Sequence, residues 1–274
     1  MSRFAYIAAN GDRYELDGDL RYSGIANEVR SSEWSYTLGA KRVTGLTRNA
    51  RTVDVNVRSV SIAEAERFRR AADGDTLNNT PGTFEADGWS QSCYIVGAKL
   101  ENVYSPSDYI AATFTAVLLD GVWRKAIRKS FTHSAVVVNT ELDFSYDYAH
   151  DYGIGTNPDE VVVDAIGGAP VSFVIYGAAV NPYIIIGSNR YEVDVTVPAG
   201  GYLLVDGLKH TITLVDQNGN KTNVFDAGVR GTGAGSGTYI FELLKPGINS
   251  VTWPSGFGFD LTYYDEEAVP PWIR

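Results

Sequence analysis

The chain has few of the residues that build covalent cross-links and soft metal sites. Its 274 residues include a single cysteine, Cys93, and three widely spaced histidines. An intrachain disulfide and a metal site made of several cysteines are therefore excluded. Cys93 lies in the strand-like run SCYIV, where a small buried hydrophobic side chain is the expected role. We therefore expect packing alone to stabilise the fold.

Long apolar runs are also missing. No run reaches the length of about 20 residues that a membrane-spanning helix needs. The six weakly apolar residues 4–9 are too few for the core of a secretory signal. Hydrophobic residues make up 44% of the chain and charged residues 20%, which excludes disordered and collagen-like classes. We expect synthesis in the cytoplasm and no membrane partner.

Positive charge is scarce in the second half of the chain. Residues 1–133 carry 17 Lys and Arg against 16 Asp and Glu, whereas residues 134–274 carry 6 against 17, giving net charges of +1 and −11. Affinity for nucleic acid comes mainly from Lys and Arg that neutralise phosphates, so this balance disfavours nucleic-acid binding. The asymmetry indicates two units with different partners, and we place their boundary near residue 133.

Strand patterns dominate what is present. Apolar and polar residues alternate over 53–58 and again over 191–197, the period of a half-buried strand. Asp87-Gly88 and Asn218-Gly219 predict tight hairpin turns. From Val161 onward, some seven short strand-like runs are separated by Pro and Gly turns. They are PVSFVIY, YIII, YEVDVTV, YLLVD, HTITLV, TYIFELL and FDLTYY. This spacing predicts an antiparallel β-sandwich.

One helix stands out against the strands. The run IAEAERFRRAAD, residues 62–73, has apolar residues at helical spacing. Ser61 and Glu64 can form a capping box at its start, and Gly74 is the predicted stop. We expect an amphipathic helix that covers one face of a sandwich.

Residues with catalytic or ligand-binding chemistry do not form a convincing site. The glycine-rich stretch 228–237 lacks the following helix and lysine of a phosphate loop, and its GAGSG run lacks the spacing of a serine nucleophile elbow. Asp143, Asp147, His150 and Asp151 could hold a cation. The interleaved aromatic residues favour an anchor against a sheet instead. A hairpin explains the calcium-loop-like residues 216–220 more simply. We expect no catalytic residue, cofactor or metal.

Several segments together resemble the distal tail protein family of long-tailed phages and of prophages in Gram-positive hosts. In the first half they are the helix ending in Asp73-Gly74-Asp75, PGTFEADGWSQSCYIVGAKLENV and TFTAVLLDGVWRK. In the middle stands LDFSYDYAHDYG. In the second half they are GGAPVSFVIYGAAVNPYIIIG, FELLKPGINSVTW and GFGFDLTYYDEEAVPPWI. Together these segments span nearly the whole chain, and it is their order and spacing that resemble the family.

The resemblance implies an all-β protein of two β-sandwich domains. Residues 1–133 would form a ring-forming sandwich with one packed helix, and residues 134–274 a connector plus a sandwich that is galectin-like or carbohydrate-module-like. The implied function is structural: a ring, commonly hexameric, that joins the tail tube to the tip or baseplate of the virion. It would serve as an adsorption hub, and DNA would pass through its channel.

The partners implied are further copies of the chain, a tail tube protein and a tail-tip or tail-associated protein. A receptor-binding protein or a cell-surface glycan could join them, whereas sequence-specific nucleic acid is not implied. The alternative function is a carbohydrate- or receptor-binding module of the adsorption apparatus, since five Trp residues could stack on sugar rings.

A ring joint needs side chains that can pair across a subunit boundary. Because Arg pairs readily with carboxylates across interfaces, we expect the helix and the Asp87-Gly88 hairpin to supply contacts. The candidate interface residues are Arg67, Phe68, Arg69, Arg70 and Trp89. The other interpretation of the three arginines, as the solvated side of a helix, stays open.

Overall fold

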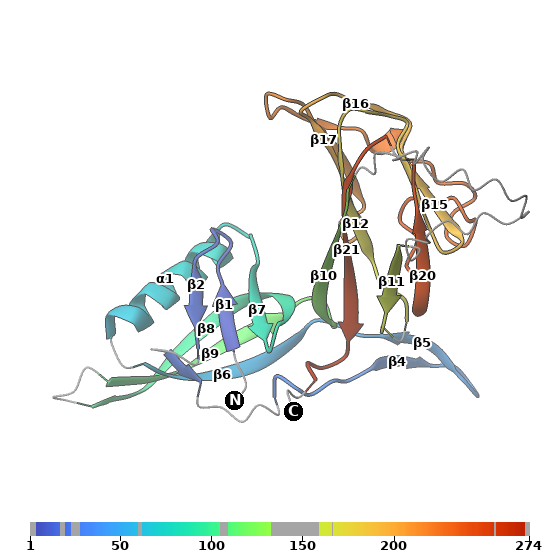
Figure 1. Cartoon of the computed structure of the whole chain (residues 1–274). Helices are drawn as coiled ribbons and strands as arrows, with labels where there is room; N and C mark the ends of the chain where they lie inside the picture. Colours follow the sequence, from blue (N-terminus) through green and yellow to red (C-terminus); the bar gives the residue numbers. More distant parts are fainter. Residues whose placement is uncertain are drawn as a thin grey trace, which may run out of the picture. The chain divides into compact units, whose positions relative to one another are not determined.

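A computed structural model describes residues 4–16, 20–22, 28–59, 62–104, 109–132, 159–165, 167–254 and 256–271. Within these ranges the chain is built of antiparallel strands with a single α-helix (Figure 1), which confirms the all-β prediction. Residues 143–151, where a cation site was weighed, lie outside the described residues.

The chain divides into two compact units. Unit 1 contains the residues up to Lys125 and those from Glu266 onward, and unit 2 contains Ala126–Asp265. The chain therefore passes from one unit to the other inside strand β10 (Trp123–Phe131) and returns inside strand β21 (Phe259–Glu267). The domain roles expected for residues 1–133 and 134–274 stay a prediction.

Unit 1 is built on a twisted antiparallel sheet. Its strands are β1 (Phe4–Ile7), β2 (Arg13–Glu15), β3 (Leu20–Tyr22), β6 (Arg51–Ser59), β7 (Gly82–Ala86), β8 (Trp89–Tyr104) and β9 (Tyr109–Leu118). They pair in the order β3-β6-β9-β8-β7-β1-β2. Val53, Val55 and Val57 of β6 are buried, as the alternation predicts. The β7–β8 turn at Asp87-Gly88 has φ angles of 53° and 82°, which confirms that hairpin.

Helix α1 (Ile62–Leu77) packs on this sheet through Phe68. The Phe68 ring meets those of Tyr6, Tyr14 and Phe114 edge-on, with centroids 4.7 to 5.6 Å apart. The prediction that the helix stops at Gly74 is wrong, because α1 continues to Leu77. The predicted cap residue Ser61 lies outside the described residues.

A buried carboxylate explains why the helix runs past Gly74. Asp75 lies one residue further on and accepts hydrogen bonds from the Tyr6 hydroxyl at 2.5 Å and the Ala9 amide at 3.1 Å. Burial and the bond to Asp75 raise the pKa of the Tyr6 phenol. Fixing the last turn of the helix to β1 outweighs the roughly 1 kcal/mol that a glycine costs inside a helix.

Cys93 is fully buried in β8, as predicted. Burial and the nearby Asp75 raise the pKa of its thiol to about 12. Because the thiolate is the reactive form, native protein at pH 8 should react with a thiol reagent at least about 10³-fold more slowly than protein in denaturant. Absorbance of the reagent's leaving group checks this. Equal rates in the two conditions would show that Cys93 is accessible.

Unit 2 contains two main sheets that share one core. Its further strands are β11 (Glu160–Val163), β12 (Val171–Tyr176), β13 (Ala179–Val180), β14 (Tyr183–Ile186), β15 (Asn189–Glu192), β16 (Thr196–Val197), β17 (Tyr202–Asp206), β18 (Thr211–Val215), β19 (Lys221–Asn223) and β20 (Gly247–Thr252). One sheet has the order β19-β18-β17-β12-β21-β10 and the other β11-β20-β14-β15. Phe173 and Phe259 from the first sheet and Ile184 and Val251 from the second belong to the same buried cluster. Unit 2 is therefore a β-sandwich.

Two strand predictions in unit 2 need correction. TYIFELL, residues 238–244, is not a strand: Ile240 and Leu244 are buried, but their amides bond to the carbonyls of Val229 and Ala169 rather than to one continuous ladder. The run 191–197 is broken where the Val195 amide bonds to Val193, so that β15 pairs with β14 and β16 with β13. The Asn218-Gly219 hairpin between β18 and β19 is confirmed.

Candidate assembly surface

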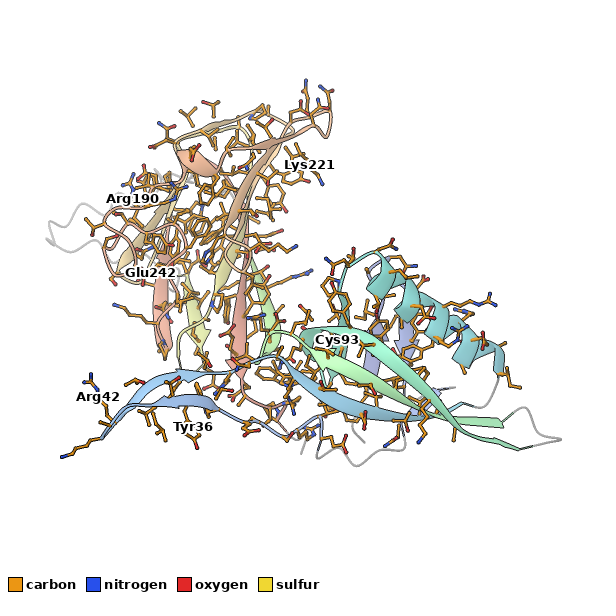
Figure 2. The ribbon with its side chains drawn as sticks, turned by 180° about the vertical axis from the view of Figure 1, so that it is seen from behind. Tyr36, Arg42, Cys93, Arg190, Lys221 and Glu242 are labelled. Carbon is orange, nitrogen blue, oxygen red and sulfur yellow. The ribbon has the colours of Figure 1, made fainter. Side chains whose placement is uncertain are left out.

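A two-stranded hairpin in unit 1 exposes one apolar face. Strands β4 (Ser35–Leu38) and β5 (Val43–Thr47) pair with each other and with no other strand of the described chain. Tyr36 lies opposite Leu46 and Leu38 opposite Val43, so these four side chains share a face. Figure 2 labels Tyr36 along the β4–β5 hairpin and Arg42 at the tip of the hairpin.

Within the described part of the chain, nothing covers the apolar face of the β4–β5 hairpin. Its side chains are 63% exposed at Tyr36, 68% at Leu38, 49% at Val43 and 59% at Leu46. A two-stranded hairpin is marginally stable alone in water, and no other strand of the described chain pairs with either edge of this one. Clustered exposed apolar side chains of this kind mark an interaction surface.

The charge of the hairpin has one sign. Residues 35–51 contain Lys41, Arg42, Arg48 and Arg51 and no acidic residue, while the whole chain carries a net charge of −10. At the base of the hairpin, the Arg48 guanidinium lies 4.3 Å from the centre of the Trp34 ring. Arg51 donates hydrogen bonds to the carbonyl oxygens of Glu28 and Val29. The base of the hairpin is thus anchored within unit 1, and Lys41 and Arg42 lie at its exposed tip.

The sequence interpretation did not single out this hairpin. The available signal was two β-prone pieces, YTL and VTGLT, separated by a short loop that starts with Gly39. The pieces are short, and the apolar residues that they carry could equally face a core. The exposure of this face is a property of the folded structure and could not be predicted from these residues alone.

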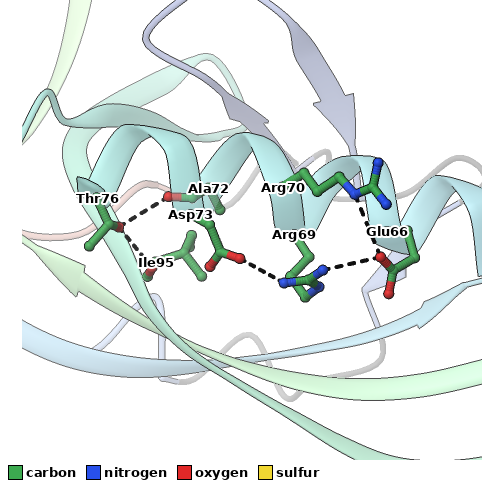
Figure 3. A network of polar contacts seen from close by, with 7 residues as sticks. All are labelled: Glu66, Arg69, Arg70, Ala72, Asp73, Thr76 and Ile95. Carbon is green, nitrogen blue, oxygen red and sulfur yellow. Dashed lines mark hydrogen bonds and ion pairs between the residues drawn. The ribbon is translucent and has the colours of Figure 1, made fainter. Parts of the chain in front are cut away.

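The predicted interface arginines lie on the exposed side of α1. Arg67 pairs with Glu64. Figure 3 shows that Arg69 pairs with Glu66 and Asp73, and that Arg70 pairs more loosely with Glu66. The two carboxylates raise the pKa of Arg69, with the bond to Glu66 as the largest cause. The helix holds four acidic residues against three arginines, so it presents no net positive patch.

The two predicted aromatic interface residues differ in exposure. Phe68 is 1% exposed, and its ring packs within the core of unit 1. Because so little of this side chain is exposed, we do not propose that it contacts a second copy. Trp89 is half-buried against the same core. The interface role of Arg67, Arg69, Arg70 and Trp89 stays a prediction.

Among the residues that the structure describes, no group of three or more His, Cys, Asp and Glu side chains lies close enough to hold a metal ion. The described part of the chain also has no helix that is long and apolar enough to cross a membrane.

Comparison with solved structures matches the fold over almost its whole length. The crystal structure of the SPP1 Dit (gp 19.1) protein, described as a paradigm of the hub adsorption apparatus in phages that infect Gram-positive hosts, aligns with a TM-score of 0.51 and 12% identity. The alignment covers 97% of this chain and 99% of that one. The chain has a Dit-like fold.

Structures of a phage baseplate agree with this Dit-like fold. Chains from the phage P2 baseplate in its activated conformation align with TM-scores of 0.61 with Ca and 0.62 with Sr, at 8% and 10% identity. Each alignment covers 98% of this chain and 100% of that chain. No model of a protein family matches the sequence, and no curated protein matches it either. The likeness is therefore one of fold, expected from the sequence motifs and now seen in the structure.

Proposed function

We propose that the protein is a structural component of a phage tail tip. Copies of the chain would assemble through unit 1 into a ring, with six subunits as the expected number. The ring would join the tail tube to the tip or baseplate and let DNA pass through its channel. The chain would act by assembly rather than by catalysis. The similar SPP1 Dit protein is described as a paradigm of a hub adsorption apparatus.

The observation that carries this proposal is the uncovered apolar face of the β4–β5 hairpin in a chain with a Dit-like fold. A second copy of the chain is the occupant that we propose for it. The positive hairpin and the negative remainder of the chain attract each other between copies. A heterologous contact of this kind, in which one patch meets a different patch on the neighbour, closes into a ring when the rotation fits.

The mass of the purified full-length chain tests the proposal. Light scattering coupled to size exclusion should give several times the monomer mass of 29.8 kDa, and the value should stay constant on dilution. A permanent ring joint of more than about 2,000 Å² would hold the copies together under these conditions. A mass of one chain at every concentration would contradict ring assembly.

A further inference from the structure

A pocket lies at the base of the β4–β5 hairpin, between the segment that enters β4 and the start of β6. It has a volume of about 300 Å³ and opens to solvent. All of its lining residues belong to unit 1, and they are Glu28, Ser31, Arg51, Thr52, Val53 and Asp54. Unit 1 therefore carries both a projecting hairpin and, at the base of that hairpin, an open pocket.

Hydrogen bonds within unit 1 fix the walls of this pocket. Arg51 donates through Nη1 to the Glu28 carbonyl oxygen at 2.9 Å and to Ser31 Oγ at 2.6 Å. Its Nη2 donates to the carbonyl oxygen of Val29 at 2.8 Å. The Asp54 amide donates to Glu28 Oε2 at 3.2 Å and so ties the segment before β4 to β6. The Arg51 guanidinium is thus directed at neutral oxygen atoms of its own chain.

Two carboxylates of the pocket have no cationic partner within the described chain. Glu28 accepts a hydrogen bond from the Asp54 amide, and Asp54 Oδ1 accepts one from the Thr115 hydroxyl at 3.1 Å. Neither carboxylate forms an ion pair with a Lys or Arg in the part of unit 1 that the structure describes. Both residues are exposed. The pocket therefore presents two negative charges to a cationic guest.

The tip of the hairpin carries two charges of the opposite sign. Lys41 and Arg42 are exposed, and among the described residues neither has an acidic partner. The Gly39 amide donates to the Arg42 carbonyl oxygen at 2.7 Å, so a tight turn holds the two cations at the tip. Strand β5 carries this tip about 13 Å beyond Thr47. With Arg42 at the outer end of the hairpin (Figure 2), the tip does not reach the pocket of its own chain.

We propose that the hairpin tip of one copy binds in the pocket of the next copy. Lys41 and Arg42 would pair there with Glu28 and Asp54 of the neighbour. A cavity of about 150 Å³ accommodates benzene, so the larger pocket has room for a lysine and an arginine side chain, which together have roughly twelve heavy atoms.

The arrangement of tip and pocket suits a closed assembly. They are different patches of one chain, so each copy would bind one neighbour through its tip and the other neighbour through its pocket. A contact of this head-to-tail kind closes into a ring when the rotation between copies fits. The inference rests on the proposed ring and adds to it the surface that receives the hairpin.

Charge reversal in the full-length chain tests this contact. Lys41→Glu with Arg42→Glu makes the tip acidic, and Glu28→Lys with Asp54→Lys makes the pocket basic. Either double variant alone places like charges at every joint between copies. The dissociation constant of the joint should therefore rise at least about tenfold in a light-scattering dilution series. Circular dichroism checks that each variant is folded.

An equimolar mixture of the two double variants tests the pairing itself. In the mixture a reversed tip meets a reversed pocket, and a native tip meets a native pocket, when the two variants alternate around the ring. At a concentration at which each variant alone is monomeric, the mixture should recover the mass of the wild type. Recovery by mixing also shows that neither variant lost assembly by unfolding.

Lys99→Glu with Lys125→Glu is the matched control. Both lysines are exposed residues of unit 1 outside the hairpin and the pocket, and their reversal changes the net charge as much as reversal of the tip does. This variant should keep the mass of the wild type, because a general increase in negative charge does not disrupt a specific joint.

Three results would overturn the inference in a protein whose wild type assembles. They are an unchanged mass in either double variant, a mixture that stays monomeric, and a control that dissociates as readily as the tip variant. A wild type that is monomeric at every concentration contradicts the ring itself, so the two failures are distinguishable.

Discussion

Replacing Leu38 and Leu46 by glutamate is expected to convert the assembled protein into monomers while each subunit stays folded. Both side chains are more than half exposed in the single chain, so the monomer loses little packing. At a joint between copies, each buried leucine contributes about 1.5 to 3 kcal/mol. Losing both should raise the dissociation constant of that joint by about 10² to 10⁴-fold. Light scattering over a dilution series measures the shift.

Ile248→Glu provides the matched control for the hairpin variant. Ile248 is 72% exposed, close to the value for Leu38, but it belongs to β20 of unit 2 and not to the hairpin. It should leave the mass unchanged. If the double hairpin variant keeps the assembled mass, the apolar face of the hairpin does not form the joint.

Arg30→Ala is expected to destabilise unit 1 by about 3 to 5 kcal/mol. The Arg30 guanidinium donates hydrogen bonds to the Asp87 carboxylate and to the carbonyl oxygen of Pro270. The Arg30 side chain is 3% exposed and that of Asp87 is fully buried. Truncating the arginine leaves a buried carboxylate with its main counter-charge removed, which is the costly way to break such a pair. Denaturant unfolding followed by tryptophan fluorescence measures the loss.

Arg13→Ala is the control for burial, because it removes an ion pair of unit 1 that is exposed to solvent. Arg13 pairs with Glu85 in the same unit, but its side chain is 41% exposed, so solvent screens the interaction. Its removal should cost no more than about 1 kcal/mol. Equal losses for the two variants would mean that the burial of the Arg30 pair adds nothing to its strength.

The regular parts of this fold could be predicted from the sequence because local periodicity and burial coincide there. The valines of β6 alternate and are buried alternately, and both hairpin dipeptides form turns. Prediction failed where a distant residue decides the local structure. Tyr6 holds the helix past Gly74 through Asp75, and Val229 and Ala169 take the backbone bonds of the apolar run around Ile240.

The candidate surfaces were harder to predict than the strands. The charge of the helix arginines led to the prediction that they form interface contacts. In the structure they pair with acidic residues of the same helix, and Phe68 is buried. The β4–β5 hairpin has an ordinary strand composition, and it stands out only because no layer of the described chain covers its apolar face.

The route of the chain through its two units has an evolutionary consequence. Unit 2 is inserted into unit 1, with its ends at residues 126 and 265 in strands β10 and β21, which are neighbours in a sheet. Adjacent strands lie only about 4.8 Å apart. Two recombination points would therefore suffice to replace the whole insert by any module whose termini are equally close. A phage lineage could in this way exchange unit 2 without redesigning the unit that we propose builds the ring.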